Sequence, residues 1–459
     1  MSNVTPLREW SVDVDHEEKA RLLTELQVAA PSSRPMDLPA GSGSGSAPAD
    51  GNRDGSAIAQ NYVAFGEKLA RLFELPSIDA PGLKLVGAQI DPSAFIATST
   101  GPTASATGKG LRLGDAVRSC ISEAVEFVSQ HYSGSEELID ADGAPPDSRS
   151  CSESEITTLL EFAGHRTHEP HSPLPWIAAQ RIHDGADAWL PAALCFRGLP
   201  AAADPPPIKL GSGCAAGPSL EWAQLHALYE LIERDAAALW WLGGQAPAAV
   251  DAQVMAGAEV RALLAELRAE RNERTTWLLD ITTDVAVPCI VAASCAADGR
   301  GLACGFAARL DPVAAATSAI VEMAQMEMAI HIVQLKRAQR GDAALVEDDW
   351  KTLKRHFDVD VAALPLLSMR QPNRREHPPI NTTITCCDAE LRHVAQMLAL
   401  RDINVYGIDI TREAIGIPAS RLLAPRLQPM TPAVVTPRLA ATIVETGGGP
   451  GLSGQVELV

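Results

Sequence analysis

The chain has 459 residues, and its 38 basic and 57 acidic side chains give a formal net charge of −19. This acidic balance argues against binding to nucleic acid, because phosphates attract basic surfaces. The length exceeds that of an ordinary single domain, so we expect either one large α+β unit or two domains.

The composition also indicates a compartment. The first residues hold no apolar core of the signal-peptide kind, and no later run approaches the length of a membrane span. The nine cysteines contain no C-x-x-C spacing, which argues against a zinc site and favours reduced thiols. The sequence therefore predicts a soluble cytoplasmic protein without contact to a membrane.

The N-terminal region is expected to be separate from the main domain. Residues 15–28 have the pattern of a short amphipathic helix, which lies in an N-terminal helical appendage of residues 1–35. Residues 36–56 are rich in Gly and Ser and predict a flexible linker. The main domain is then expected to cover residues 57–459 and to begin with a helix over residues 62–73.

A first pair of acids follows two expected extended segments, residues 83–90 and 94–100. Gly-Lys-Gly at residues 108–110 opens a helix that carries Glu123 and Glu126 among apolar side chains. Because residues three apart share a helix face, these carboxylates are expected to lie side by side.

The most informative segment runs from Gly211 to Gly244, where a Gly-rich stretch leads into a helix with apolar residues on every side. This helix carries Glu230 and Glu233 at the same spacing. A solvated pair is the ordinary interpretation, but the apolar surroundings favour a buried pair, which Arg234 alone cannot neutralise. A bound cation is the favoured hypothesis.

A third helix, residues 311–330, carries Glu322 and Gln325 among Ala, Ile, Val and Met. Carboxylates that converge from several helices can hold hard divalent cations, and Mg²⁺ is the usual one when nucleotide phosphates supply further ligands. A di-iron site would also use glutamates, but it requires Glu-x-x-His on facing helices, which the sequence lacks. The residue types therefore favour Mg²⁺ with a nucleotide.

A weak internal repeat indicates the architecture. Residues 277–282 followed by residues 287–288 resemble residues 407–411 followed by residues 417–418, and residues 184–191 form a looser copy. Each copy has the pattern of a strand, a polar turn and a second strand that opens at proline. Together with the acid-bearing helices, the repeat predicts an α+β fold in which antiparallel β-hairpins pack on long helices.

The ensemble resembles the YcaO family, enzymes that use ATP to activate backbone amides of ribosomally made peptides. The order and spacing of the motifs follow the family over about residues 60–427. The residues that carry the resemblance are Gly108-Lys109-Gly110 with Ser119, Glu123 and Glu126; Ala215-Ala216-Gly217 leading to Glu230-Leu231-Ile232-Glu233-Arg234-Asp235; and Glu322 with Gln325.

This resemblance implies a site and a substrate. It implies that Arg234 contacts ATP, with Lys109, Ser119 and Gln325 also on the nucleotide side. It further implies a homodimer and a ribosomal precursor peptide as the substrate. An amide of this peptide becomes an azoline if a neighbouring side chain attacks it, or a thioamide if external sulfide attacks it. The residues that would coordinate Mg²⁺ on the phosphates are Glu123, Glu126, Glu230, Glu233 and Glu322.

Four positions depart from the family pattern. Pro218 and Trp222 stand where the family usually has Asn and Glu as metal ligands. Ser318 replaces an arginine near the nucleotide, and Phe127 replaces an arginine that commonly follows the second glutamate. The loss of a ligand could remove a metal ion, so the alternative is a degenerate YcaO-like scaffold that binds peptide or nucleotide for an active partner.

The C-terminal tail bears on the product. Azoline-forming relatives typically end in Pro-x-Pro-x-Pro, whereas Pro432 and Pro437 lack that spacing and residues 446–451 make a Gly-rich turn. This difference favours the thioamide branch, which works with a separate sulfur-handling partner, often a TfuA-like protein. A leader-peptide-binding protein is the alternative partner.

Further motifs point to no separate site. Residues 101–110 resemble a phosphate loop, but six residues rather than four separate Gly101 from Gly108, and Gly110 replaces the Ser/Thr that would bind Mg²⁺. A weaker contact to an anion through backbone N–H groups and Lys109 is still possible. The histidines of residues 165–171 are expected in a surface loop rather than at a metal. Trp240-Trp241 are expected to close the core.

Overall fold

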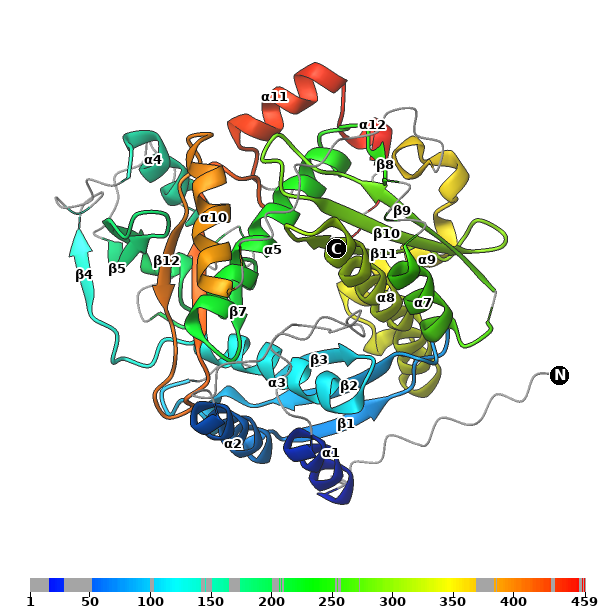
Figure 1. The fold of residues 1–459 in the computed structure, drawn as a ribbon, viewed down its shortest axis with the longest axis horizontal. Coiled ribbons are helices and arrows are strands. Elements are labelled where there is room, and N and C mark those ends of the chain that lie inside the picture. The colour runs from blue at the N-terminus through cyan, green and yellow to red at the C-terminus, as the bar shows by residue number, and fades with distance from the viewer. Residues whose placement is uncertain are drawn as a thin grey trace.

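The computed structural model describes residues 16–28, 52–99, 103–141, 145, 151–164, 174–199, 206, 208, 210–251, 254, 257–271, 273–368, 384, 386–430, 434–453, 456 and 458. Long helices alternate with antiparallel strands along this part of the chain (Figure 1), which confirms the predicted α+β class.

The strands and helices have the following bounds. The strands are β1 Arg71–Leu75, β2 Lys84–Ile90, β3 Ala104–Gly110, β4 Leu138–Ala141, β5 Leu174–Arg181, β6 Asp187–Pro191, β7 Cys214–Ala216, β8 Ala248–Ala249, β9 Arg274–Asp280, β10 Cys289–Ala296, β11 Ala303–Ala308, β12 Tyr406–Asp409 and β13 Ala419–Leu423. The α-helices are α1 His16–Val28, α2 Asn52–Lys68, α3 Leu113–Ser129, α4 Glu153–Phe162, α5 Leu220–Trp241, α7 Ala258–Arg268, α8 Pro312–Arg340, α9 Glu347–Asp358, α10 Cys387–Ala399, α11 Pro437–Thr446 and α12 Pro450–Ser453. Short 3₁₀ turns lie at Pro92–Ala94, Ala192–Leu194, Asp342–Ala344, Val361–Ala363 and Pro365–Leu367.

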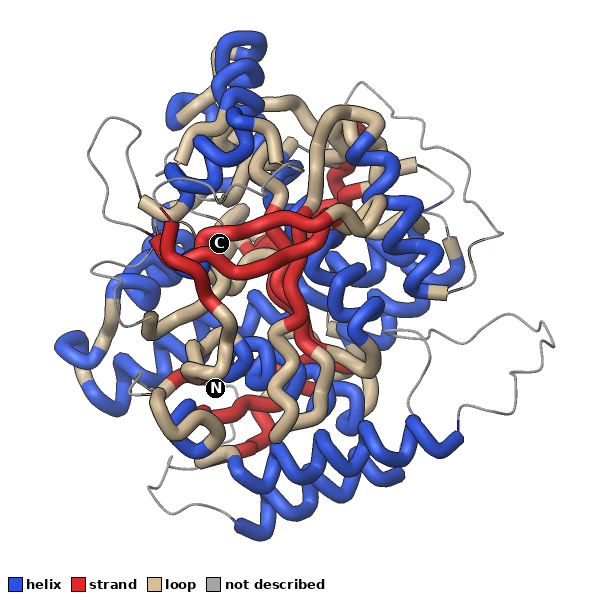
Figure 2. Tube along the Cα trace, turned by 90° about the vertical axis from the view of Figure 1, so that its left-hand side faces the viewer, coloured by secondary structure: helices blue, strands red, loops and turns tan. Residues whose placement is uncertain are grey.

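The described strands form three sheets, in the orders β1-β2-β3, β11-β10-β9-β8 and β4-β5-β12-β13-β7, with β6 paired to β5. Every strand pairing among them is antiparallel. Figure 2, viewed from the left-hand side of Figure 1, shows strands of the third sheet in the foreground, because β4 lies at the outer edge of the molecule. One acid-bearing helix packs on each sheet: α3 on the first, α8 on the second and α5 on the third. The arrangement therefore brings the predicted acidic motifs toward the middle of the molecule.

The predicted hairpins occur at all three positions. The β9–β10 and β12–β13 pairs are antiparallel neighbours, as the internal repeat predicts. In the looser copy, β5 and β6 form the hairpin and residues 182–186 connect them, with the turn at residues 182–184. Pro191 ends β6 rather than opening it, so the predicted position of that proline is wrong.

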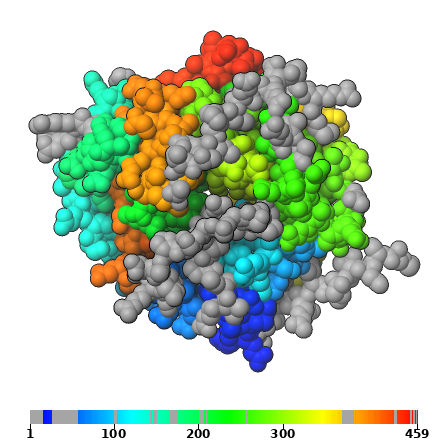
Figure 3. All heavy atoms as spheres, in the orientation of Figure 1, coloured from blue at the N-terminus to red at the C-terminus, as the bar shows by residue number. Residues whose placement is uncertain are grey.

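The N-terminal helices lie against the main body. The helix expected over residues 15–28 is α1, whose Leu22, Leu23 and Leu26 are buried against α2, α3 and β1. In Figure 3, α1 lies at the lower edge of the molecule and α11 at the upper edge. Helix α2 begins at Asn52, inside the expected linker, and the remaining linker residues lie outside the described part of the chain.

Two predicted elements in this region are wrong. The helix expected over residues 62–73 ends at Lys68, and its last residues belong to β1 because Leu72 alternates with more exposed neighbours. The extended segment expected over residues 94–100 does not form: Ala94 ends a 3₁₀ turn at whose start the Asp91 carboxylate accepts from the Ser93 N–H, and residues 95–99 contain turns and no strand. Residue 100 lies outside the described part of the chain.

The Gly-Lys-Gly motif is also placed differently from its prediction. Residues 108–110 are the end of strand β3, paired with residues 84–86 of β2, and they do not form a helix-opening turn with free N–H groups. Glycine is needed at residue 108 because a Cβ there would lie 2.1 Å from the Ala116 carbonyl oxygen and from the Cys120 nitrogen. Gly305 of β11 allows α8 an equally close approach.

Helix α8 is 29 residues long and, among the described helices, is long and apolar enough by composition to cross a membrane. The expectation that no run approaches a membrane span is therefore too strong. Most of its apolar window is buried, and the helix packs on β10 and β11. A place in the core accounts for its composition. Trp240 and Trp241 are each 1% exposed and close the core as predicted.

Candidate active site

Five glutamates on α3, α5 and α8 are linked through their electrostatic interactions. Burial raises the pKa of Glu123, Glu126 and Glu233, the charge of Glu230 raises all three further, and Glu322 adds to the rise at Glu233. The carboxylates predicted from three separate motifs are therefore gathered at one place, although their helices pack on different sheets.

The central pair on α5 is held by one arginine and one backbone amide. Gly213 donates its N–H to Glu230 Oε2 at 3.0 Å, and Arg234 Nη2 lies 3.4 Å from Glu230 Oε1. Arg234 Nη1 lies 3.4 Å from Glu233 Oε1. Arg234 thus spans both acids, but burial together with Glu322 and Glu230 still raises the pKa of Glu233 to about 8. A single guanidinium does not neutralise the pair, as the sequence predicts.

The pair on α3 accepts hydrogen bonds from two strands. Thr107 of β3 donates its N–H to Glu123 Oε2 at 3.3 Å, and Ala216 of β7 donates its N–H to Glu126 Oε1 at 3.2 Å. Water reaches the Glu123 side chain, yet protein atoms crowd its carboxylate, and desolvation raises its pKa to about 7. Burial and the neighbouring glutamates raise the pKa of Glu126 well above its ordinary value.

Strand β3 connects α3 to α8. Lys109 Nζ lies 3.8 Å from Glu322 Oε2, and Gln325 donates from Nε2 to Thr107 Oγ1 at 2.9 Å. Thr107 and Lys109 are two residues apart and therefore point to the same side of the strand. Lys109, Gln325 and Glu322 are thus neighbours, while half-buried Ser119 shares the helix face of Glu123 and Glu126.

The donor set fits Mg²⁺ bound together with a nucleotide. In the described part of the chain, no three His, Cys, Asp or Glu side chains come close enough to hold a metal ion by themselves. Mg²⁺ usually takes one or two carboxylates and completes its shell with water and substrate phosphates. Separate carboxylates, three of which are oriented by backbone N–H groups, match that requirement better than a closed protein site does.

The raised pKa values predict a pH dependence of stability. Between the ordinary pKa of 4.5 and the folded-state pKa of Glu233, about 8, the folded chain holds a proton that the unfolded chain has lost. Stability of the metal-free protein is therefore expected to fall as pH rises from about 4.5 to about 8. Thermal unfolding in a chelator should show this fall, and Glu233→Gln should flatten it. A slope that stays the same in Glu233→Gln would contradict the assignment.

Arg309 is a site residue that the sequence prediction missed. Its guanidinium carbon lies 5.2 Å from the centre of the Tyr229 ring, and the next residue, Leu310, donates its N–H to the Tyr229 hydroxyl at 3.2 Å. Burial, followed by the positive charge of Arg309, lowers the pKa of His226 to about 3, and Arg309 also opposes the rise in the pKa of Glu233. The feature of the sequence that could have indicated Arg309 is its position just before Asp311, the N-cap of α8.

Trp222, the departure from the family pattern on α5, stacks on a histidine of the same helix. The Trp222 ring stacks on His226 with ring centres 3.6 Å apart and an angle of 16°. A Cβ at residue 217 would lie 2.1 Å from this ring, so Gly217 makes room for it. The Trp222 ring therefore lies at the start of α5, on the same side as His226 and Glu230.

The other three departures, Phe127, Ser318 and Pro218, lie at ordinary packing or helix-start positions. Phe127 packs edge-on against His131, with the Arg197 guanidinium 5.4 Å from its ring centre. Ser318 is half-buried on α8, and Pro218 precedes the N-cap of α5. The nine cysteines form no disulfide among the described residues, and the histidines of residues 165–171 lie outside that part of the chain.

The sequence of the chain matches a known family over most of its length. The family described as YcaO cyclodehydratase, ATP- and Mg²⁺-binding, matches residues 107–428. The chain belongs to the YcaO family. The glutamates on α3, α5 and α8 all fall within the matched range.

Individual proteins are similar to the chain in sequence or in fold. An uncharacterized protein in the tfuA 3′ region of Rhizobium leguminosarum bv. trifolii is 30% identical over 272 residues, which cover 56% of this chain and 61% of that protein. A heterocyclase solved with substrate and cofactor is similar in fold, with a TM-score of 0.63 and 20% identity over 85% of this chain and 55% of that one. YcaO from Methanopyrus kandleri, bound with AMPPCP and Mg²⁺, has a TM-score of 0.56 and 18% identity over 86% of this chain and 92% of that one. The chain therefore spans about half of the heterocyclase chain and almost all of the Methanopyrus chain.

Proposed function

We propose that this YcaO chain uses ATP and Mg²⁺ to activate a backbone amide of a ribosomal precursor peptide, and that the product is a thioamide. The observation that carries the proposal is the convergence of five carboxylates from three helices, three of which, Glu230, Glu233 and Glu322, act on Arg234. So many acids in a partly buried site are costly unless cations neutralise them.

The side chains divide the work by position. Arg234 presents a fixed positive charge between the two α5 acids, and Lys109 and Gln325 offer donors from the β3–α8 side. We assign these three residues and Ser119 to the nucleotide. The carboxylates that would hold Mg²⁺ are Glu123, Glu126, Glu230, Glu233 and Glu322. When bound, Mg²⁺ would neutralise charge on the phosphates and on the transferring phosphoryl group.

The proposed reaction exchanges oxygen for sulfur. Hydrosulfide adds to the carbonyl carbon of the peptide bond, and the former carbonyl oxygen takes the γ-phosphoryl group from ATP. The carbon–oxygen bond then breaks, so phosphate leaves with that oxygen, and the sulfur-bound proton passes to phosphate. The products are the thioamide, ADP and phosphate. An azoline would form instead if a neighbouring Cys, Ser or Thr side chain added to the carbon.

One relative supports the thioamide branch and its partner. The Rhizobium relative is described as lying in a tfuA 3′ region. We therefore propose a TfuA-like partner ahead of a leader-peptide-binding one, together with a cytoplasmic homodimer.

A scaffold without catalysis is the second candidate, and the stacked Trp222–His226 pair favours it. The aromatic ring of Trp222 cannot coordinate a cation as a carboxylate does, so the chain could bind peptide or nucleotide and support an active partner.

Mass spectrometry of the precursor peptide after co-expression with neighbouring genes tests the proposal. Exchange of oxygen for sulfur supports thioamidation, whereas loss of water at a Cys, Ser or Thr indicates an azoline. A modified peptide that appears equally with Glu230→Gln in place of the native chain would assign catalysis to the partner and this chain to the scaffold.

A further inference from the structure

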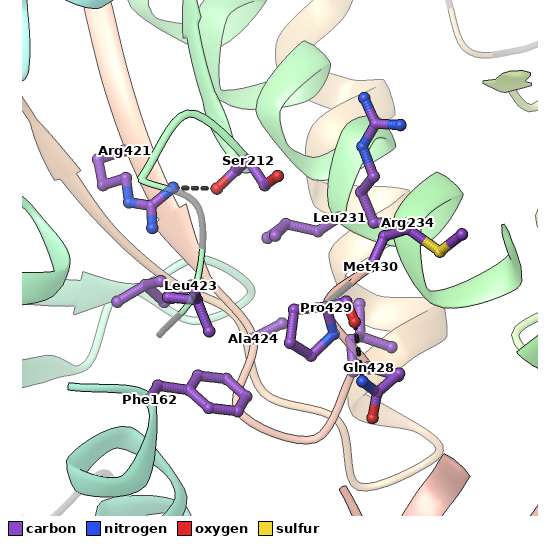
Figure 4. Close-up of a pocket in the computed structure, with 12 residues that line it drawn as sticks. Phe162, Ser212, Leu231, Arg234, Arg421, Leu423, Ala424, Gln428, Pro429 and Met430 are labelled. Atoms are coloured by element: carbon purple, nitrogen blue, oxygen red, sulfur yellow. Dashed lines mark hydrogen bonds between the residues drawn. The ribbon is translucent and has the colours of Figure 1, made fainter. Parts of the chain in front are cut away.

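Next to Arg234, the structure contains a small, mainly apolar pocket (Figure 4) with a volume of about 30 Å³. Since one water molecule needs at least about 10–15 Å³, the pocket has room for about two. Arg421 is at one end, and Arg234 lines the other side with its stem while its guanidinium points away from the pocket. The lining residues are Phe162, Ile208, Ser212, Leu231, Arg234, Arg421, Leu423, Ala424, Leu427, Gln428, Pro429 and Met430.

Arg421 is fully buried and has one nitrogen without a partner. Its Nε donates to the Leu194 carbonyl at 2.9 Å and its Nη1 donates to the Ser212 carbonyl, whereas its buried Nη2 has no hydrogen-bond partner. No carboxylate in the described part of the chain lies within ion-pair distance of this guanidinium. A buried cation is normally paired, so its charge needs a further explanation.

The surrounding groups do not supply the missing negative charge. Glu230 is the acid that acts on Arg421 electrostatically, but it is already engaged by Arg234 and by the Gly213 N–H. The thiols of Cys195 and Cys214 are also near, and burial raises both pKa values, that of Cys195 to about 12, so both are neutral. Water could accept from Nη2, but it would leave the charge unbalanced.

We propose that this pocket binds hydrosulfide, the nucleophile of the thioamide reaction, through Arg421 Nη2. This inference rests on the proposed function and adds to it the place where the sulfur is held. A single heavy atom fits the volume, and the apolar lining favours a weakly hydrated, polarizable monoanion over phosphate, which is larger and strongly hydrated. A neighbouring guanidinium also favours the ionised, nucleophilic form of a sulfur acid.

The position of the pocket suits delivery to the phosphate site. Ser212, whose carbonyl accepts from Arg421, precedes Gly213, whose N–H binds Glu230. Arg234 extends from the pocket wall to the carboxylates of Glu230 and Glu233. The anion would therefore lie next to the segment that orients Glu230, one of the proposed Mg²⁺ ligands.

Anaerobic thermal unfolding with sodium hydrosulfide, chloride or phosphate at equal ionic strength tests the binding itself. We expect hydrosulfide to raise the unfolding temperature of the native chain by about 1–2 °C more than chloride, and phosphate to add nothing beyond ionic strength. Arg421→Gln should lose this difference. Equal shifts with hydrosulfide and chloride would mean a general halide-sized site and would overturn the proposal.

Two further variants keep the test decisive if Arg421→Gln fails to fold. Ala424→Leu fills the pocket and leaves the guanidinium in place, so it should also lose the hydrosulfide shift. Arg426→Gln removes a nearby arginine whose side chain is 41% exposed, and it should keep the shift. A full shift in Ala424→Leu would overturn the proposal. MgATP binding, measured by calorimetry on Ala424→Leu, should be unchanged, so failure of the pocket and failure of the nucleotide site are distinguishable.

Discussion

Replacing Glu230 by glutamine is expected to weaken Mg²⁺-dependent ATP binding by about 100-fold or more, since even groups that only orient a metal ligand contribute about 10–100-fold. The amide has nearly the same shape and can still accept from the Gly213 N–H. It loses the negative charge that faces Arg234 and that a cation would use. Calorimetry with ATP in the presence and absence of Mg²⁺ measures the change.

The same substitution should affect stability in the opposite direction. Glu230 raises the pKa of Glu123, Glu126 and Glu233, so its charge repels theirs. Removing it should make the metal-free protein more stable while nucleotide binding weakens. A carboxylate with a structural role would instead lower stability and leave binding intact.

Glu221→Gln is the matched control, because Glu221 is exposed on the first turn of the same helix. It should bind MgATP as the native chain does. Glu123→Gln should behave like Glu230→Gln, with a smaller effect on stability because its side chain is more exposed. If Glu230→Gln and Glu123→Gln both keep the native affinity in a folded protein, the carboxylates are not metal ligands.

The acidic helices were predictable because their signal is local. Glutamates three residues apart in an otherwise apolar helix are costly wherever the helix packs, so the sequence alone indicates a buried acidic site. Glu126 and Glu230 act on each other in the structure although their helices pack mainly on different sheets, and this tertiary contact leaves no pattern within either helix.

Other parts of the site depend on tertiary contacts that leave no local pattern. Arg309 and Arg421 look like ordinary charged residues in the sequence, and only packing places one over Tyr229 and buries the other. Gly-Lys-Gly has the composition of a turn, but the close approach of α3 to β3 explains why Gly108 must be glycine within a strand. The turn propensity of glycine therefore predicted the wrong element, because Gly108 is required for packing within strand β3 and not for a turn.

Replacing Trp222 by glutamate is expected to raise Mg²⁺-dependent ATP hydrolysis of the isolated chain by about tenfold, if the ring occupies the position of a metal ligand. The helix should tolerate the new charge, because residue 222 is in the first turn of α5, where a negative charge is favoured. Its backbone N–H would keep the Ser219 cap and its carbonyl would keep the bond to His226 Nδ1.

Trp222→Phe is the control for this change, since it keeps an aromatic ring on His226 without adding a carboxylate. The phenylalanine variant should hydrolyse ATP at the native rate, whereas the glutamate variant should also bind Mg²⁺ more tightly in titrations with ATP present. A glutamate variant that folds but gains neither Mg²⁺ affinity nor hydrolysis would show that Trp222 does not stand in a metal position. A high rate in the unmodified chain would remove the scaffold alternative, because the remaining carboxylates and Arg234 would then be sufficient for phosphoryl transfer without a ligand at residue 222.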